Sequence, residues 1–387
     1  MSNHTKQTIA LTGGGAAGLL FLHHFLQRPE LTDRYQLHLF DPAEKNSNDH
    51  TWCFWERGAG SLDKYLFRAY KTLDIHADGL ALRRVAISPY TYKHIRSLEF
   101  YRALNHQIAV TPEITRRRQW VDSVHPDGTV HLRRGTTERF DYVFNSVLFQ
   151  KPDLRGCNYL DQHFRGWVVR TETDRFDPDC ATFMDFRLPQ ENDTRFLYVL
   201  PHDRRTALVE IAVFSNEHWR MEDYDRELET YLETHLTDRY EVLEREHGII
   251  PMTDAEFPKD TGRLFHFGTG GGDVKPSSGY AFYRIHQHAA ALVEALAAGT
   301  LPRLDLPFGD ARHRWMDRVF LNVLVQNRVP AARVFRLLFQ RNTVPHVLSF
   351  LDEETSLLQD LRFMNQMPKL PFIRAAAREQ LRMVGIG

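Results

Sequence analysis

Residues 8–22 read TIALTGGGAAGLLFL, and this stretch decides the fold of the N-terminal part of the chain. Its apolar start predicts a buried strand, and the apolar run after Gly18 predicts a helix. Between them, Gly13, Gly15 and Gly18 form a G-x-G-x-x-G pattern. In this pattern the first two glycines permit a tight turn and a close approach to a pyrophosphate, and the third packs helix against strand. The free N–H groups at the start of the helix then bind the phosphates.

A second strand follows at the distance expected for a βαβ unit. Residues 35–40 read YQLHLF and end at Asp41, whose carboxylate is placed to accept hydrogen bonds from an adenosine ribose. A glycine pattern alone also occurs in ordinary turns. Strand, glycines, helix, strand and acid in one unit predict a Rossmann-like domain that binds an adenine dinucleotide.

The composition argues against several other classes of protein. Among 387 residues, 49 are basic and 50 acidic, so the chain lacks the positive charge of a nucleic-acid-binding protein. Three scattered cysteines form no disulfide framework, which predicts a reducing environment. No apolar stretch reaches the ~20 residues that span a bilayer, and the first strand begins too early for a signal peptide. The 20 histidines lack metal-binding spacing, so no metal site is expected.

The middle third of the chain has a different pattern. Four apolar segments separated by turn residues predict successive antiparallel strands, at residues 166–171, 181–186, 195–200 and 207–214. Residues 220–235 have the apolar spacing of a helix. This part therefore predicts a sheet distinct from the parallel sheet of the dinucleotide-binding unit.

A second glycine-rich turn lies far along the chain, between a predicted strand at 264–267 and a predicted helix at 282–298. Its candidate cofactor-binding residues are Gly268, Thr269, Gly270, Gly271, Lys275, Pro276, Ser277 and Gly279. Two distant strand–glycine–helix units around one dinucleotide are the arrangement of a flavoprotein, which predicts FAD. An ordinary surface loop is the alternative interpretation of these glycines.

Residues 46–61 read as a loop that contains two tryptophans, a phenylalanine and a cysteine within a few positions. Aromatic residues clustered in this way contact the core or a ligand rather than solvent. Thr51 and Trp52 in this segment are therefore further candidates for the cofactor site.

These patterns predict three parts. An FAD-binding domain comprises residues 1–80, 100–150 and 258–300, and an antiparallel-sheet substrate domain comprises residues 81–99 and 151–257. Residues 301–387 are predicted to be helical and, on one interpretation, to contact a membrane.

One segment of the helical region, residues 333–341, allows two interpretations. Phe335, Leu338 and Phe339 share a helical face, and three arginines lie close by. A helix that faces the core is somewhat favoured. The alternative is an interfacial helix that dips into lipid while its arginines contact head groups.

The most unusual residue is Glu210, which interrupts a nearly continuous apolar strand, where an ionised carboxylate is costly. If Glu210 is buried, its pKa rises and the group can hold and deliver a proton. An ion pair with Arg204 or Arg205 is an equally supported alternative. Asp185 raises the same question on what we expect to be an adjacent strand. Two acids in an aromatic-rich sheet suggest acid–base chemistry in an apolar cavity, where ring faces stabilise a cation.

From end to end the chain resembles the bacterial lycopene beta-cyclases, a family of FAD-dependent carotenoid cyclases. The most specific matching segments are TWCFW at 51–55 and KPSSGY at 275–280. Other matching segments are GGGAAG at 13–18, FMDF at 183–186, FLYVLP at 196–201, ALVE at 207–210, GIIPMT at 248–253 and FLDEET at 350–355. Asp273 and the charged turn at 202–205 depart from the family pattern.

The resemblance implies a geranylgeranyl-reductase-like flavoprotein fold and the conversion of lycopene through gamma-carotene to beta-carotene. In this non-redox reaction an open end is protonated, closes into a beta-ionone ring and loses a ring proton. The resemblance further implies FAD in its reduced form, NADPH or NADH as reductant, and Glu210 as proton donor and acceptor. Because the C40 substrate resides in a bilayer, the implied location is the cytoplasmic surface of the inner membrane.

Two other functions remain as alternatives at this stage. A flavin monooxygenase or isoprenoid reductase of the same fold would use its flavin for redox chemistry. A carotenoid-binding protein would keep the fold without activity, but the glycine pattern and Glu210 favour an enzyme.

Overall fold

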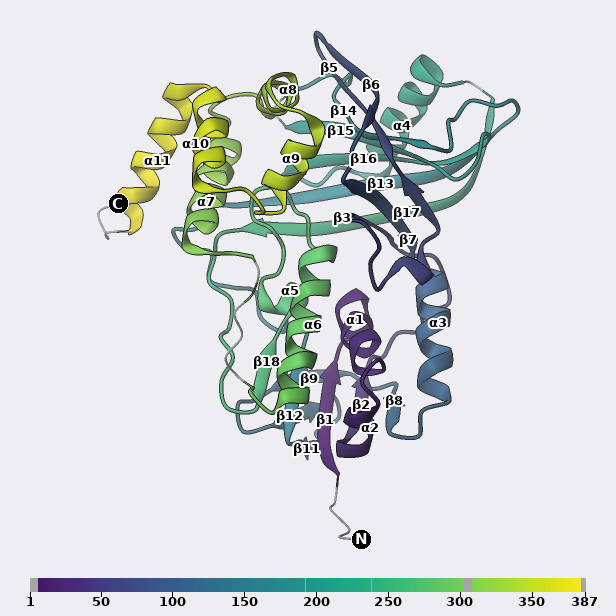
Figure 1. Cartoon of the computed structure of the whole chain (residues 1–387), viewed down its shortest axis with the longest axis vertical. Helices are drawn as coiled ribbons and strands as arrows, with labels where there is room; N and C mark the ends of the chain where they lie inside the picture. Colours follow the sequence, from purple (N-terminus) through teal and green to yellow (C-terminus); the bar gives the residue numbers. More distant parts are fainter. Residues whose placement is uncertain (1–5, 192, 238, 302–305, 307, 384–387) are drawn as a thin grey trace.

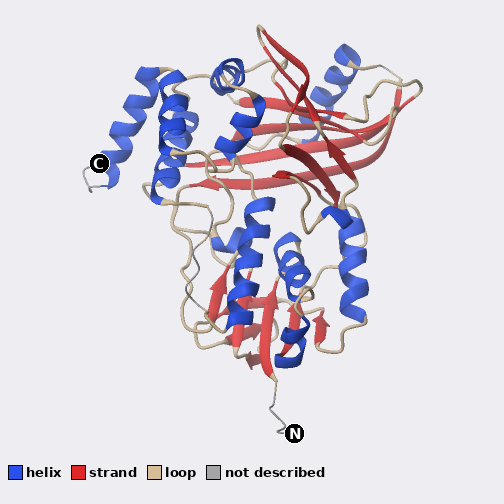
Figure 2. Ribbon diagram, in the orientation of Figure 1, coloured by secondary structure: helices blue, strands red, loops and turns tan. Residues whose placement is uncertain are grey.

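The structure is a computed structural model that describes residues 6–191, 193–237, 239–301, 306 and 308–383. A parallel sheet with its helices lies in the lower part of Figure 1, and a longer, mostly antiparallel sheet lies above it. The C-terminal helices cover the upper left of the molecule (Figures 1 and 2).

The parallel sheet has five strands in the order β18-β12-β1-β2-β8. The strands are β1 (Gln7–Thr12), β2 (Tyr35–Phe40), β8 (Ile114–Arg117), β12 (Tyr142–Asn145) and β18 (Leu264–His266). Ile9, Leu11 and Leu37 are buried, as expected for strands covered on both faces. On one face lie α1 (Ala16–Phe25), α2 (Pro29–Arg34), α3 (Ser97–Ala109) and α6 (Phe282–Ala298), and on the other a small sheet of β9 (Val121–Val124), β10 (Thr129–Leu132) and β11 (Thr137–Arg139).

The larger sheet has seven strands in the order β17-β13-β16-β15-β14-β5-β6, all antiparallel except the β14–β5 pair. They are β5 (Thr72–Ala77), β6 (Leu80–Ala86), β13 (Tyr159–Thr171), β14 (Cys180–Asp185), β15 (Thr194–Pro201), β16 (Thr206–Ser215) and β17 (Tyr240–Thr253). Side chains alternate between the two faces along each strand. On β16, Val209 and Ile211 face α4 (Met221–His235), whereas Leu208 and Phe214 face the opposite core.

A third sheet joins the two large ones and consists of β3 (Thr51–Arg57), β7 (Tyr90–Arg96) and β4 (Arg68–Tyr70). The loop predicted at residues 46–61 is thus partly wrong, because residues 51–57 form a strand. Side chains alternate between the two faces of this strand, and both faces are covered. Trp52 and Phe54 enter the core of the parallel sheet, while Cys53 and Trp55 enter that of the larger sheet.

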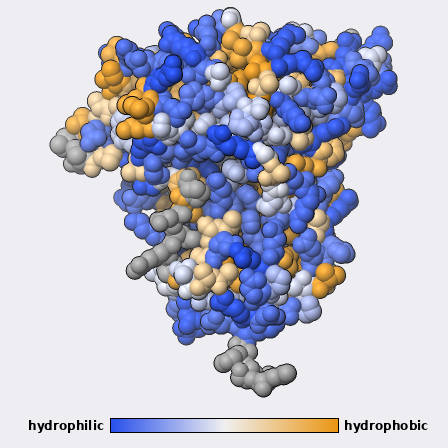
Figure 3. All heavy atoms as spheres, in the orientation of Figure 1, coloured by the Kyte–Doolittle hydropathy of each residue, from blue (hydrophilic) through white to orange (hydrophobic). Residues whose placement is uncertain are grey.

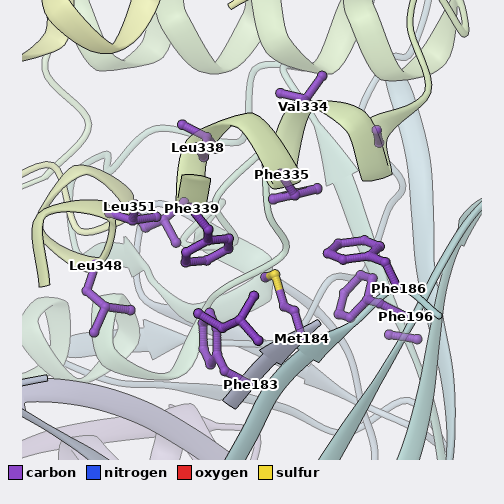
Figure 4. Close-up of a cluster of buried hydrophobic side chains, with 14 of the residues drawn as sticks. Phe183, Met184, Phe186, Phe196, Val334, Phe335, Leu338, Phe339, Leu348 and Leu351 are labelled. Atoms are coloured by element: carbon purple, nitrogen blue, oxygen red, sulfur yellow. The ribbon is translucent and has the colours of Figure 1, made fainter. Parts of the chain in front are cut away.

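The C-terminal region is helical, as predicted. It contains α7 (Ala311–Val325), α8 (Ala331–Arg341), α9 (Val344–Leu351), α10 (Leu357–Gln366) and α11 (Lys369–Met383). Phe335 of α8 stacks on Phe186 with ring centroids 5.5 Å apart, and the Phe339 ring centroid lies 6.4 Å from that of Phe183 (Figure 4). Both α8 rings are buried, so the core-facing interpretation of residues 333–341 is confirmed and the lipid-dipping one is wrong for this helix.

The predicted fold class is confirmed: an α/β fold with a parallel sheet, a large, mostly antiparallel sheet and C-terminal helices. The division into three parts remains a proposal. β5 lies in a different sheet from the one predicted. Its residues fall within the 1–80 segment assigned to the FAD-binding domain, but it pairs with β14 and β6 in the larger sheet. Across the described ranges, none of the helices has both the length and the apolar character to cross a membrane.

Candidate active site

The first glycine turn forms a cradle at the start of α1. Gly13 adopts a left-handed conformation with φ of 95°, and a Cβ at Gly18 would collide with the Gly13 carbonyl. A Cβ at Gly15, by contrast, would have no neighbour within 4 Å. No side chain caps α1, and its first turn contains no acidic residue. Open space therefore lies beside an uncapped helix N-terminus, which is the geometry that accepts a phosphate.

Asp41 lies beside this turn and is held by backbone donors. Its Oδ2 atom accepts a hydrogen bond of 2.8 Å from the N–H of Gly14, and its Oδ1 atom accepts one of 2.8 Å from that of Ala43. A Cβ at Gly14 would lie 2.5 Å from Oδ2, so the glycine allows the carboxylate to reach the turn. The predicted ribose acceptor is thus fixed at the mouth of the cradle.

The first and second glycine turns meet at one hollow of about 450 Å³. Gly13, Gly14, Gly15 and Asp41 line one side of it, and Thr269 lines another. The second turn forms the short helix α5 (Gly268–Gly271), where a Cβ at Gly270 would lie 2.7 Å from the Val147 carbonyl oxygen. The expectation that both turns serve one site agrees with this arrangement, whereas an ordinary surface loop does not.

Asp273, which departs from the family pattern, stabilises the second turn. Its Oδ2 atom accepts a 2.6 Å hydrogen bond from the N–H of Gly268, and its Oδ1 atom lies 2.8 Å from Nδ1 of His288 on α6. All these polar atoms are buried, so each hydrogen bond satisfies a group that would otherwise be costly. The extra acid therefore ties the turn to the helix that follows it.

The segment after the turn, residues 275–280, is anchored by two of its side chains. Lys275 and Ser277 point towards the C-terminal helices: Lys275 Nζ lies 2.5 Å from Glu353 and 3.0 Å from Asp317, and Ser277 Oγ donates to Asp317 over 2.5 Å. Gly279 adopts a left-handed φ of 74°. The helix after this segment, α6, begins at Phe282, as predicted. The two side chains thus hold the turn against Asp317 of α7 and Glu353.

The predicted residues Thr51 and Trp52 lie on β3, where the two cores meet. Trp52 stacks on Phe282 at the start of α6, with ring centroids 5.3 Å apart and planes 18° apart. On the opposite side of the strand, the ring centroid of Trp55 lies 4.8 Å from that of Tyr280, the residue that ends the second turn. β3 therefore packs against the residues that connect the second glycine turn to α6.

Glu210 lies on the face of β16 that is turned towards these aromatic residues. Tyr198 is directly opposite it on β15, and the Tyr198 hydroxyl lies 3.2 Å from that of Tyr280. Burial, reinforced by the neighbouring carboxylate of Glu246, raises the pKa of Glu210 well above its usual value. Glu210, Cys53 and Tyr280 each keep some accessible surface despite deep burial, which indicates that they border internal space.

The alternative in which Glu210 pairs with a turn arginine does not hold. Arg205 instead pairs with Asp174 through an N–O distance of 2.9 Å. Among the residues with described side chains, Glu210 takes part in no salt bridge. A buried carboxyl without a cation favours its protonated form.

Asp185 is not brought together with Glu210. The two strands are separated by β15, so they are not adjacent as expected, and Asp185 accepts hydrogen bonds from Arg187 Nε at 2.9 Å and the Tyr231 hydroxyl at 2.8 Å. Tyr231 belongs to α4, on the face of the sheet opposite to Glu210. Burial opposes ionisation, but the hydrogen bonds from Arg187 and Tyr231 outweigh it and lower the pKa of Asp185. Asp185 therefore binds α4 to the sheet through its hydrogen bond with Tyr231.

Sequence reasoning missed Glu246, which lies beside Glu210. Glu246 is on β17, a strand whose other glutamates, Glu241 and Glu244, look the same in the sequence. The pairing of β17 with β13 places Glu246 opposite Gly166, where it is buried, while Glu241 and Glu244 remain accessible nearer the start of the strand. The one available signal was Gly166, because a glycine inside a strand often marks a close approach.

The fold and its two glycine turns define a class of α/β proteins with a dinucleotide-binding domain and a second, antiparallel-sheet domain. Solved structures of similar fold include a variant of 2-methyl-3-hydroxypyridine-5-carboxylic acid oxygenase, with TM-score 0.59, 12% identity, and 89% of this chain and 96% of that chain covered. Another is a geranylgeranyl bacteriochlorophyll reductase-like protein from Thermoplasma acidophilum, with TM-score 0.56, 13% identity, and 97% and 100% covered. At these identities the likeness concerns the fold alone.

Sequence comparison gives the family. The comparison with curated proteins found no significant match. The model of the lycopene cyclase protein family matches residues 8–377, nearly the whole chain. The chain belongs to the lycopene cyclase family, as its sequence motifs predicted.

Proposed function

We propose that this protein is a lycopene beta-cyclase that closes the open ends of lycopene into beta-ionone rings, through gamma-carotene to beta-carotene. The observation that carries the proposal is the Glu210 carboxyl, held among aromatic side chains and in no salt bridge with any residue that the structure describes, in a chain of the lycopene cyclase family. Ring closure that begins with protonation of an alkene needs a group that holds a proton at neutral pH, which a buried carboxyl can do.

In the proposed mechanism, Glu210 donates its proton to the terminal double bond of the substrate. The neighbouring double bond closes on the resulting tertiary cation, and a ring proton returns to a carboxylate at the site. Tyr198, Tyr280 and Trp55 surround this region and offer ring faces that stabilise a cation. The same side chains exclude water, which would otherwise capture the cation as an alcohol.

The residues present fit FAD as the dinucleotide. The open space at Gly15 and the uncapped start of α1 suit the pyrophosphate, Asp41 suits the ribose, and the backbone from Gly268 to Gly271 suits the part that extends towards Tyr280. When bound in its reduced form, the flavin would supply negative charge close to the cation. NADPH or NADH is proposed as the source of electrons for that form.

We also propose that the protein binds a membrane surface through α10 and α11 rather than through α8. These two helices expose large apolar side chains, with Leu358 79% and Ile373 62% exposed. Figure 3 shows apolar surface over this corner of the molecule, and Arg362, Lys369 and Arg374 are exposed on the same helices. Apolar side chains beside basic ones are the pattern of an interfacial helix on anionic lipid.

An apolar pocket supports the same orientation. It is walled by Met364 of α10 and Phe372 of α11 at one end and reaches Ser277 and Ser278 at the other. A hydrocarbon drawn from a bilayer beneath α10 and α11 could thus pass between the C-terminal helices towards the second glycine turn without crossing water.

Substituting Gly15→Asp tests the cofactor site. Aspartate is a favoured N-cap residue and its side chain would enter open space, so the melting temperature of the protein without flavin is expected to stay or rise. Its charge opposes a pyrophosphate, so the Kd for FAD, measured by flavin fluorescence titration, should rise about 10-fold or more. Gly15→Ser, a neutral cap, is the control. Equal FAD affinity in the aspartate variant and the natural protein would contradict this placement.

Substituting Glu210→Gln tests the acid. The amide has nearly the shape of the carboxyl but carries no proton to donate, so the rate of ring formation from lycopene should fall about 10²–10⁴-fold. Rates are measured by chromatography of the carotenoids with reduced FAD present. Glu241→Gln, at an exposed position of β17, is the matched control and should keep its activity. A Glu210→Gln variant that cyclises at the normal rate would exclude Glu210 as the acid.

The double substitution of Leu358→Glu and Ile373→Glu tests the membrane surface. Co-sedimentation with vesicles containing phosphatidylglycerol should fall about 10-fold or more, since two large apolar contacts are lost. Val110→Glu replaces an apolar side chain that is 66% exposed far from these helices and serves as the control. If all three proteins bound the vesicles equally, α10 and α11 would not be the docking surface.

A further inference from the structure

Gly166 of β13 brings two glutamates together. In the sheet, β13 lies between β16 and β17, and Gly166 is directly opposite Glu210 on one side and Glu246 on the other. Residues directly opposite on neighbouring strands share a face of the sheet. A side chain on the middle strand normally separates the two outer ones, but Gly166 has none. Both carboxyl groups therefore lie on the face that also holds Tyr198 and Leu208.

The space above Gly166 is filled by these two side chains and by that of Leu208. A Cβ added at Gly166 would lie 2.9 Å from Cγ of Glu246 and 3.0 Å from Oε2 of Glu210. The φ of Gly166 is not in the left-handed region, so the backbone itself does not require glycine. Glycine is required because the side chains of Glu246, Glu210 and Leu208 all come close to this position.

Glu246 lacks the partners that a buried carboxylate needs. Its side chain is buried, with 6% of the residue exposed, and no donor within the described residues reaches either oxygen with normal hydrogen-bond geometry. Two adjacent buried carboxylates without a cation cannot both be ionised, because each opposes the charge of the other. The pair therefore retains at least one proton at neutral pH.

None of the described titratable groups next to Glu210 and Glu246 supplies a cation that would let both carboxyl groups ionise. Thr51 and His50 approach from the start of β3, Cys53 from the same strand, and Tyr198 from β15. Burial raises the pKa of the Cys53 thiol and of the Tyr198 hydroxyl, so both are neutral. His50 is partly exposed and lies 3.2 Å from Asp49, which is its closer acidic partner. Burial raises the pKa of Glu246, although Glu210, Thr51 and His50 partly offset it.

We propose that Glu246 is the second catalytic carboxyl of the site and accepts the ring proton while Glu210 donates the first one. The inference rests on the proposed cyclase function, in which the carbon that gains a proton and the carbon that loses one are different atoms. Two carboxyl groups that face the same space can serve two carbons, whereas a single one must move between them.

The proposed steps balance. The O–H bond of Glu210 breaks as a C–H bond forms at the terminal alkene, and the electron pair of the second double bond forms the ring C–C bond. A ring C–H bond then breaks, its electron pair forms the new ring double bond, and the proton forms an O–H bond on Glu246. Transfer of that proton from Glu246 to Glu210 across Gly166 restores the starting state. No electron or proton is gained or lost overall.

The pH dependence of kcat in the full-length protein, with reduced FAD and lycopene, tests the pair. With one shared proton, the natural protein should show a bell-shaped profile that belongs to the pair as a whole. Glu246→Gln removes the proton acceptor, so kcat should fall about 10²–10⁴-fold and the acidic limb should disappear. The alkaline limb should move to lower pH, because the like charge that raises the pKa of Glu210 is gone. Glu244→Gln, on the same strand, is the control and should keep the natural profile.

Infrared spectroscopy tests the pair without relying on activity. The carbonyl band of a protonated carboxyl should titrate at a lower pH in Glu246→Gln than in the natural protein, because the remaining carboxyl no longer faces a like charge. Gly166→Ala should shift this titration in the same direction as Glu246→Gln, since a methyl group separates the two carboxyl groups. An unchanged titration in Glu246→Gln would overturn the pair.

The two proposals can fail separately. If the natural protein forms no rings from lycopene, the cyclase function fails, while the infrared titration still decides whether the carboxyl groups share a proton. If the natural protein cyclises lycopene and Glu246→Gln keeps both its rate and its pH profile, the role of Glu246 is overturned and the cyclase function stands.

Discussion

A carboxyl group buried among aromatic side chains, with no cation beside it within the described part of the chain, is the constraint on which this site depends. Burial makes the ionised form of Glu210 costly, so the carboxyl is stable on β16 as a neutral acid, or with a neighbouring group that can hold the proton in its place. The apolar wall that makes ionisation costly also excludes water. Burial thus does two things at once: it keeps the acid protonated, and it protects a cation from capture.

This acid belongs to the larger sheet, whereas the glycine cradle belongs to the parallel sheet, and β3 connects them. Side chains alternate along β3, so Trp52 enters one core and Cys53 the other. Trp52 packs on the start of α6, directly after the second glycine turn. A cofactor held at Gly15 and extended past Thr269 would therefore approach the face of the sheet that carries Glu210. The proposed function needs this proximity, because the charge of the cofactor has to lie close to the cation formed beside Glu210.

The sequence predicted the parts of the fold that local patterns control. The strand, glycines and helix around Gly15 are encoded within a few residues, and α6 follows its apolar spacing over the predicted range. Relations across strands were harder to predict. Asp185 and Glu210 looked alike in sequence, yet strand order and side-chain alternation place them on opposite faces of the sheet. The partner of Glu210 is Glu246, which no local pattern distinguishes from Glu244, because its burial is set by the register with Gly166.

The balance of electrons during ring formation tests the central claim most directly. Lycopene is incubated with the full-length protein and a limited amount of reduced FAD without oxygen, and rings formed are compared with flavin oxidised. An acid–base reaction at Glu210 predicts many rings per flavin, with the flavin still reduced at the end. Oxidation of one flavin for every ring formed would contradict it and indicate redox chemistry on the same fold.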